Sequence, residues 1–200
     1  MPTVSNEAGD GFLGEFLVHD KLVRIYQGDI TNLVTDVIVS SDDNYPKMNG
    51  ALSWKIREVG GDEIYKKARN LVPLPKGNIA VTTAGKLQVK KIFHAVVIGW
   101  RSEFLPSQEI IRQVVHTCIG RANQYGFQTI TFPLLATGAA GFPIELAWET
   151  ILQQIIKDLS KENQNVLEVI IALYERQMVE KLKIKLFLER IKKDGWQTFL

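Results

Sequence analysis

Three short segments of the sequence place small, acidic or hydroxyl residues where they could contact a phosphorylated ligand. The first is QGDIT at residues 27–31, directly after an apolar run typical of a strand. A carboxylate followed by a β-branched residue can hold a ligand amine through the side chain and the neighbouring backbone. Asp29 could equally serve only to cap a turn, as aspartate often does. This segment alone leaves both interpretations open.

The second segment is SSDDN at residues 40–44, followed by MNGA at residues 48–51, where a helix is expected to begin. Small residues at a helix start let backbone N–H groups approach an anion, and the helix dipole assists. The adjacent Asp42 and Asp43 suggest a metal site or an acid–base pair. Because neighbouring side chains of an extended chain point to opposite faces, we do not expect the two carboxylates to converge.

The third segment is PLLATGAAGFP at residues 133–143, which joins an apolar run to the most amphipathic stretch of the chain. Small residues between a strand and a helix can hold a phosphate through backbone amides, without positive side chains. The segment lacks the Lys-Ser/Thr pair of a P-loop and is not a GxGxxG turn. A flexible connection without a ligand is the alternative interpretation.

The elements that must position these segments alternate between two types. Apolar, β-branched runs predict strands at residues 16–26, 34–40, 78–84, 91–98, 129–133 and 166–173. Apolar residues at helical spacing predict helices around residues 111–122 and 148–159, with weaker ones at 51–60 and 62–71. This alternation indicates a layered α/β domain with a parallel or mixed sheet.

The two ends of the chain are less regular. Residues 1–14 are rich in small and polar residues, which predicts a tail or linker, and residues 15–200 are expected to form one domain. A linker-like start is typical of a domain that is fused to others in a longer protein. The segment 176–199 has a KLKIKLF core that alternates like a strand, whereas its length and leucines favour a helix. We predict a helix.

Composition narrows the class of protein. The 200 residues, with 46% hydrophobic and 23% charged residues, suit one compact domain. The net charge of +2 does not support a nucleic-acid partner. Cys118 is the only cysteine, and the histidines show no ligand pattern, so we expect neither a metal nor a cofactor. His94 is interpreted as a core histidine. With no membrane span or signal peptide in view, the sequence predicts a reducing, cytoplasmic location.

Taken in order, the motifs resemble those of macrodomains, a family of ADP-ribose-binding modules, from about residue 23 to about residue 174. GDIT at 28–31 matches the family's GDIT, SSDD at 40–43 stands at its NAAN segment, and MNGAL at 48–52 stands at its glycine triplet. GNIAVTTAGKL at 77–87, IFHAV at 92–96 and TGAAGFP at 137–143 match later motifs. The resemblance implies a three-layer α/β/α sandwich with a central mixed, largely parallel sheet of about six strands.

The resemblance also implies a ligand, ADP-ribose or a related NAD-derived nucleotide, and roles for its contacts. Asp29 would accept a hydrogen bond from the adenine amine, with the Ile30 backbone beside it. Asp43 would meet the distal ribose hydroxyls, and Tyr174 would either stack on adenine or pack at the edge of the fold. Two loops would wrap the diphosphate, and their expected ligand-binding residues are Asn49, Gly50, Ala51, Leu52, Thr137, Gly138, Ala139, Ala140, Gly141 and Phe142.

Several positions depart from the family pattern. Asp43 stands where the family has Asn, so an ionised side chain accepts hydrogen bonds without donating and adds negative charge near a diphosphate. Ser53 stands where a hydrolytic branch has a water-activating Asp. Ala140 stands where many members have an aromatic residue over the distal ribose. These changes argue against ester hydrolysis of that kind and leave Asp43 as the one candidate for a catalytic base.

The sequence therefore favours a binding module, a reader or sensor of ADP-ribose, with ADP-ribosylated protein as its macromolecular partner and no membrane partner. A hydrolase acting on mono-ADP-ribosyl groups or ADP-ribose-1''-phosphate is the alternative, so enzymatic activity stays open. A scaffold that binds RNA or poly(ADP-ribose) through the basic residues near the C-terminus is a third interpretation. Their alternation with acidic residues is more typical of a solvated helix face.

Overall fold

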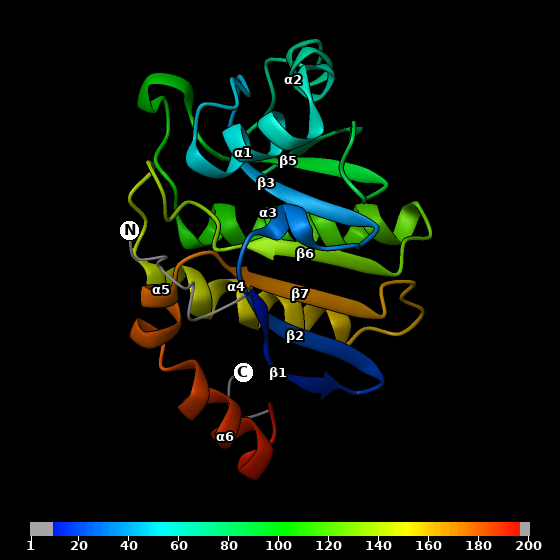
Figure 1. Ribbon diagram of the computed structural model, residues 1–200, viewed down its shortest axis with the longest axis vertical. Coiled ribbons are helices and arrows are strands. Elements are labelled where there is room, and N and C mark those ends of the chain that lie inside the picture. The colour runs from blue at the N-terminus through cyan, green and yellow to red at the C-terminus, as the bar shows by residue number, and fades with distance from the viewer. Residues whose placement is uncertain (1–9, 197–200) are drawn as a thin grey trace, which may run out of the picture.

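A single mixed sheet organises the molecule, as the computed structural model of residues 10–196 shows (Figure 1). Its strand order within these residues is β1-β2-β7-β6-β3-β5-β4. The five inner strands run parallel, and the edge strands β1 and β4 run antiparallel to their neighbours. The bounds are β1 (Gly11–Val18), β2 (Lys21–Gln27), β3 (Val37–Asp43), β4 (Ile79–Thr83), β5 (Lys91–Ile98), β6 (Thr129–Pro133) and β7 (Glu168–Leu173).

Helices cover both faces of this sheet. On one face lie η1 (Ile30–Asn32), α1 (Ala51–Gly60) and α2 (Asp62–Arg69), and on the other lie α3 (Gln108–Gln124) and α4 (Ile144–Leu159) (Figure 1). Alternate residues of a strand therefore enter two separate hydrophobic clusters: Ile38 packs toward α1 and Val39 toward α3 and α4. The sheet and the two layers of helices on its faces form a three-layer α/β/α sandwich, which confirms the predicted fold class.

The prediction of one strand at residues 16–26 is wrong. This segment belongs to an antiparallel hairpin of β1 and β2 that turns at His19 and Asp20, so the sheet has one strand more than the six that were expected. His19 has a φ of 55°. Because turns of this kind usually carry glycine or asparagine at a positive φ, a histidine gives no signal for the turn in the sequence.

The ends of the chain also differ from expectation. β1 begins at Gly11, so the last four residues of the expected tail belong to the sheet, and residues 1–9 lie outside the described part. The C-terminal segment is helical as predicted, but it forms two helices, α5 (Arg176–Lys181) and α6 (Ile184–Asp194). The break falls at Lys183, whose φ of 49° lies in the left-handed region.

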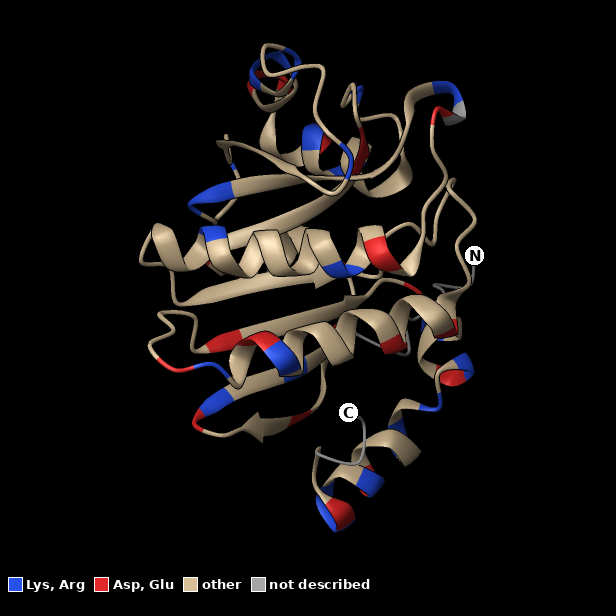
Figure 2. Ribbon diagram, turned by 180° about the vertical axis from the view of Figure 1, so that it is seen from behind, with Lys and Arg blue, Asp and Glu red and all other residues tan. Residues whose placement is uncertain are grey.

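Helix α6 packs against the edge of the sheet and against α4. The Phe187 ring lies 6.0 Å from the Phe16 ring and 5.2 Å from the Trp148 ring, in both cases edge to face. Both basic and acidic residues lie along α6 (Figure 2). No helix within residues 10–196 is long and apolar enough to cross a membrane.

Candidate functional site

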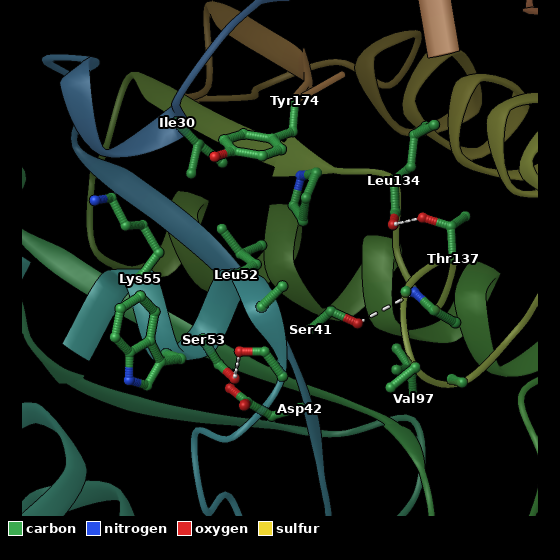
Figure 3. Close-up of a pocket in the computed structure, with 18 of the residues that line it drawn as sticks. Ile30, Ser41, Asp42, Leu52, Ser53, Lys55, Val97, Leu134, Thr137 and Tyr174 are labelled. Atoms are coloured by element: carbon green, nitrogen blue, oxygen red, sulfur yellow. Dashed lines mark hydrogen bonds between the residues drawn. The ribbon is translucent and has the colours of Figure 1, made fainter. Parts of the chain in front are cut away.

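A cavity of about 540 Å³ opens at the carboxyl ends of the five parallel strands (Figure 3). It is bounded by the loop after β2, the end of β3, the start of α1, the loop between β6 and α4, and the segment after β7. This edge is where open α/β sheets bind their ligands. All three segments that the sequence singles out reach this cavity.

Most of the residues predicted to bind the ligand line the cavity, but Gly141 and Phe142 do not. The Gly141 N–H donates to the Gly138 carbonyl at 2.9 Å, and the Phe142 N–H donates to the Ala136 carbonyl at 3.0 Å. Both amides therefore close the loop on itself and are not available to a ligand. The predicted residues that do line the cavity are Asp29, Ile30, Asp43, Asn49, Gly50, Ala51, Leu52, Thr137, Gly138, Ala139, Ala140 and Tyr174.

The Asp29 side chain caps the short helix η1 and still offers an oxygen to the cavity. Its Oδ1 accepts from the Thr31 N–H at 2.9 Å and from the Thr31 Oγ1 at 2.7 Å. No described residue donates to its Oδ2. The two interpretations of Asp29 are thus compatible, because the cap uses one oxygen and leaves the other to a ligand amine.

Tyr174 follows β7 and is 66% exposed, at the same end of the cavity as Ile30 (Figure 3). A phenol ring that is largely free of packing can stack on a flat ligand. The structure therefore favours an exposed ring over edge packing for this residue.

The start of α1 supplies backbone donors to the cavity. Gly50 is the N-cap and has no side chain to satisfy the first amides of the helix. The first intrahelical bond that it accepts comes from the Trp54 N–H at 2.8 Å, which leaves the amides of the first turn without partners in the helix. A helix start of this kind attracts anions, with no positive side chain required.

The loop between β6 and α4 lies on the other side of the cavity and is tied to β3. The Ala136 N–H donates to the Ser41 Oγ at 3.1 Å, and the Thr137 Oγ1 donates to the Leu134 carbonyl at 2.9 Å (Figure 3). These bonds fix the loop where the amides of residues 137–140 border the cavity. Two sets of backbone amides thus approach one space from two sides.

Asp42 and Asp43 both border the cavity, but their carboxylates contact different groups: Asp42 contacts His94, and Asp43 accepts from the Tyr45 N–H. The pairing register between β3 and β5 shifts between these two residues. The extra residue lies in β5, because Asp42 pairs with Val96 and Asp43 pairs with Ile98, so consecutive side chains of β3 keep their alternation. Burial raises the pKa of the Asp43 carboxyl, and the neighbouring Asp42 charge raises it further. The Tyr45 N–H, which donates to Asp43 Oδ1 at 2.7 Å, and the Lys47 charge oppose this shift.

Asp42 belongs to a buried row of polar side chains. Its Oδ2 lies 2.9 Å from Nδ1 of His94, and Nε2 of His94 lies 3.0 Å from the Thr82 Oγ1. The His94 side chain is fully buried, which agrees with the interpretation of a core histidine whose ring is satisfied. The row runs across β3, β5 and β4 beneath α1 and α2, and its Asp42 end reaches the cavity.

Among the described residues, no carboxylate is hydrogen-bonded to the Ser53 hydroxyl. Its Oγ donates to the Gly50 carbonyl at 3.2 Å and is buried at the first turn of α1 (Figure 3). A hydroxyl without a neighbouring base activates water poorly. Within residues 10–196, no group of three His, Cys, Asp or Glu side chains could hold a metal ion.

Sequence reasoning missed several residues of the cavity. Lys47 and Lys55 contribute positive charge, and the Lys47 ammonium lies 3.2 Å from the centre of the Trp100 ring. The apolar Val97, Ile98 and Met178 also line the space. Lys55 was predictable, because it lies one helical turn after Ala51 and faces the same side. Val97 and Ile98 come from the end of β5, Met178 comes from α5, and Lys47 comes from the loop between β3 and α1, and the motifs carry no signal for them.

Comparisons with known proteins agree with this architecture. Residues 39–151 match the model of the Macro domain family. A protein of Sulfurisphaera tokodaii is 30% identical over 78% of this chain and 86% of its own length. An O-acetyl-ADP-ribose deacetylase of Escherichia fergusonii is 28% identical over 66% of this chain and 77% of its own length.

Among solved structures, the Oceanobacillus iheyensis macrodomain with ADP superposes with a TM-score of 0.81 at 24% identity. The superposition covers 93% of this chain and 100% of that one. The family model spans more than half of the chain and includes most of the elements that surround the cavity. From the shared sequence pattern and the shared fold, we conclude that this chain belongs to the macrodomain family.

Proposed function

We propose that this chain binds ADP-ribose or a related NAD-derived nucleotide and acts as a reader or sensor of that group. The observation that carries this proposal is the meeting of three features in one cavity: the acidic turn at Asp29, the start of α1 and the loop of residues 137–140. A related macrodomain with the same fold has been solved with ADP.

The end of the cavity at Asp29 suits adenine. The free Oδ2 of Asp29 would accept a hydrogen bond from the adenine amine, while Oδ1 holds the turn. The exposed Tyr174 ring would stack on the base, and Ile30 offers an apolar contact. A charge-assisted hydrogen bond of this kind is about twice as strong as a neutral one.

The middle of the cavity suits a diphosphate. Two sets of backbone amides face it, one at the first turn of α1 and the other at residues 137–140. Such donors and the helix dipole bind phosphate without lysine or arginine. At the far end, Asp43 would accept hydrogen bonds from ribose hydroxyls at the cost of some repulsion from the phosphates.

Calorimetric titration of the chain with ADP-ribose tests the proposal. We expect a dissociation constant of about 1 μM, which corresponds to about −8 kcal/mol. Asp20→Ala provides a matched control, because the Asp20 side chain is 77% exposed and lies on the turn between β1 and β2, outside the cavity. Absence of heat and of any thermal shift at millimolar ADP-ribose would overturn the proposal.

Hydrolysis is the second candidate function. It is favoured by the relative named as an O-acetyl-ADP-ribose deacetylase and by the two carboxylates at the far end of the cavity. It is opposed by Ser53, whose hydroxyl is engaged with a backbone carbonyl. Incubation with mono-ADP-ribosylated protein, O-acetyl-ADP-ribose and ADP-ribose-1''-phosphate, followed by chromatography of the products, separates the two. A reader binds these molecules and releases them unchanged.

A further inference from the structure

Asp10, at the start of the described chain, contacts the turn that holds Asp29. Its Oδ2 accepts from the Asp29 N–H at 3.2 Å, the Asn32 Nδ2 at 3.0 Å and the Tyr26 hydroxyl at 3.2 Å. One carboxylate oxygen thus bridges the end of β2, the turn and the helix η1. Asp10 does not line the cavity.

The chain around Asp10 is built to admit this contact. Gly28 has a φ of 140°, and a Cβ there would lie 2.3 Å from the Asp10 carboxyl carbon. Any side chain at position 28 would therefore push Asp10 away from the turn. Two residues after Asp10, the Phe12 ring packs edge to face on the Tyr26 ring at 5.3 Å, which anchors the start of β1.

The three groups that contact Asp10 Oδ2 are all hydrogen-bond donors, as an acceptor-only carboxylate requires. Burial and the neighbouring Asp10 charge raise the pKa of Tyr26 to about 12, so its hydroxyl keeps its proton and donates. The Asp29 amide is fixed directly, and the orientation of the Asp29 side chain follows from its backbone. A group held in place before the ligand arrives loses less conformational freedom on binding.

We propose that Asp10 is a positioning residue that sets the adenine preference of the site by holding the turn of Asp29. This inference rests on the proposed function. It assigns to the N-terminal segment a role in base selection. Asp10 does not touch the base and acts through Asp29 and the backbone of the turn.

The test compares binding of ADP and of inosine diphosphate by calorimetry. Hypoxanthine carries a carbonyl oxygen where adenine has its amine, so this position accepts a hydrogen bond and no longer donates one to Asp29. The wild-type chain is expected to prefer ADP. Asp10→Ala should lower the ADP affinity about fivefold to tenfold and leave the inosine diphosphate affinity nearly unchanged, so the preference falls by the same factor.

Two further variants keep the test decisive. Asp10→Asn retains an acceptor oxygen and should restore most of the preference, and it also serves if the alanine variant folds poorly. Asp20→Ala, an exposed aspartate on the same hairpin, should change neither affinity. An equal loss for both nucleotides in Asp10→Ala, or no loss for either, overturns this inference alone. A wild-type chain that binds neither ADP-ribose nor ADP overturns the proposed function and the inference with it.

Discussion

The carboxylate of Asp42 lies 2.9 Å from Nδ1 of His94, and both side chains are almost completely buried. A buried carboxylate is tolerated only when its charge and lone pairs find partners. The imidazole supplies one partner, and its other nitrogen is held by Thr82 at 3.0 Å. The row therefore stiffens the end of β3, at the point where the strand enters the cavity.

Removal of the imidazole should destabilise the fold. In His94→Ala, Asp42 loses its partner, and we expect the free energy of unfolding to fall by about 3 kcal/mol or more. Urea unfolding measures this change. The Asp42→Ala and His94→Ala double variant should lose less than the sum of the two single losses, because the pair acts as a unit. Additive losses would show that the two residues do not interact energetically.

Asp29→Ala should weaken ADP-ribose binding by about 1.5–3 kcal/mol, because it removes a charge-assisted hydrogen bond to the adenine amine. Since Asp29 also caps η1, Asp29→Asn is the matched variant. Its amide oxygen can still accept from the Thr31 N–H, but an NH2 group replaces Oδ2 and cannot accept from the adenine amine. Calorimetry should show weaker binding for both variants. Parent-like affinity in both would reduce Asp29 to a turn residue.

Asp43→Asn separates two roles of this carboxylate. If Asp43 is only a weakened ribose contact, the amide should tighten ADP-ribose binding and leave hydrolysis at zero. If Asp43 is a general base, the parent should show turnover and the variant should abolish it. Binding and product formation are measured on the same preparations. Strong turnover by the parent that survives the substitution would contradict both roles.

The stability contribution of Asp43 should depend on pH in a defined direction. Burial and Asp42 raise its pKa in the folded state above the ordinary aspartate value. Protonation therefore favours the folded state: the stabilising effect is complete below the unfolded-state pKa and is lost as the pH rises through the raised, folded-state pKa. Compared with the parent, Asp43→Asn should gain relative stability as the pH rises from the acid range to neutrality. Urea unfolding of both chains over this range checks the sign.

Lys183→Gly should stabilise the junction between α5 and α6. The φ of 49° at this residue is unfavourable for a side chain and costs little for glycine. We expect a gain of roughly 0.5–1 kcal/mol in the free energy of unfolding, offset in part by the extra freedom of glycine in the unfolded chain. Thermal unfolding would show a raised midpoint, and a lowered midpoint would contradict this account of the break.

Local signals in the sequence predicted the central elements well. The strand at residues 91–98 and the strand at 129–133 match the structure, and α1 ends at the glycine pair, with Gly60 as its last residue and Gly61 as its C-cap. The Asp29 turn and the two loops were also predicted from local sequence, because small residues beside apolar runs mark the ends of strands. All of these features are determined by residues adjacent in the sequence.

Features that depend on distant residues were missed. The turn at His19 adopts a positive φ with a residue that gives no warning of it. The register shift between β3 and β5 beside Asp42 and Asp43 comes from an extra residue in β5, which the sequence of β3 alone does not encode. Asp10 lies in a segment of tail-like composition, and only its contacts with Tyr26, Asp29 and Asn32 reveal its position.

The place of β7 in the sheet has a consequence for how the protein is made. Within residues 10–196, β7 is the last strand, yet it lies between β2 and β6 and joins the first hairpin to the rest of the sheet. While synthesis is still upstream of Glu168, the hairpin of β1 and β2 has no parallel neighbour, and the cavity lacks the wall formed by Ala172 and Tyr174. On the proposed function, ligand affinity should arise only when the sheet is complete, and a nucleotide at 100 times its dissociation constant would then add about 2.7 kcal/mol to the stability of the whole domain.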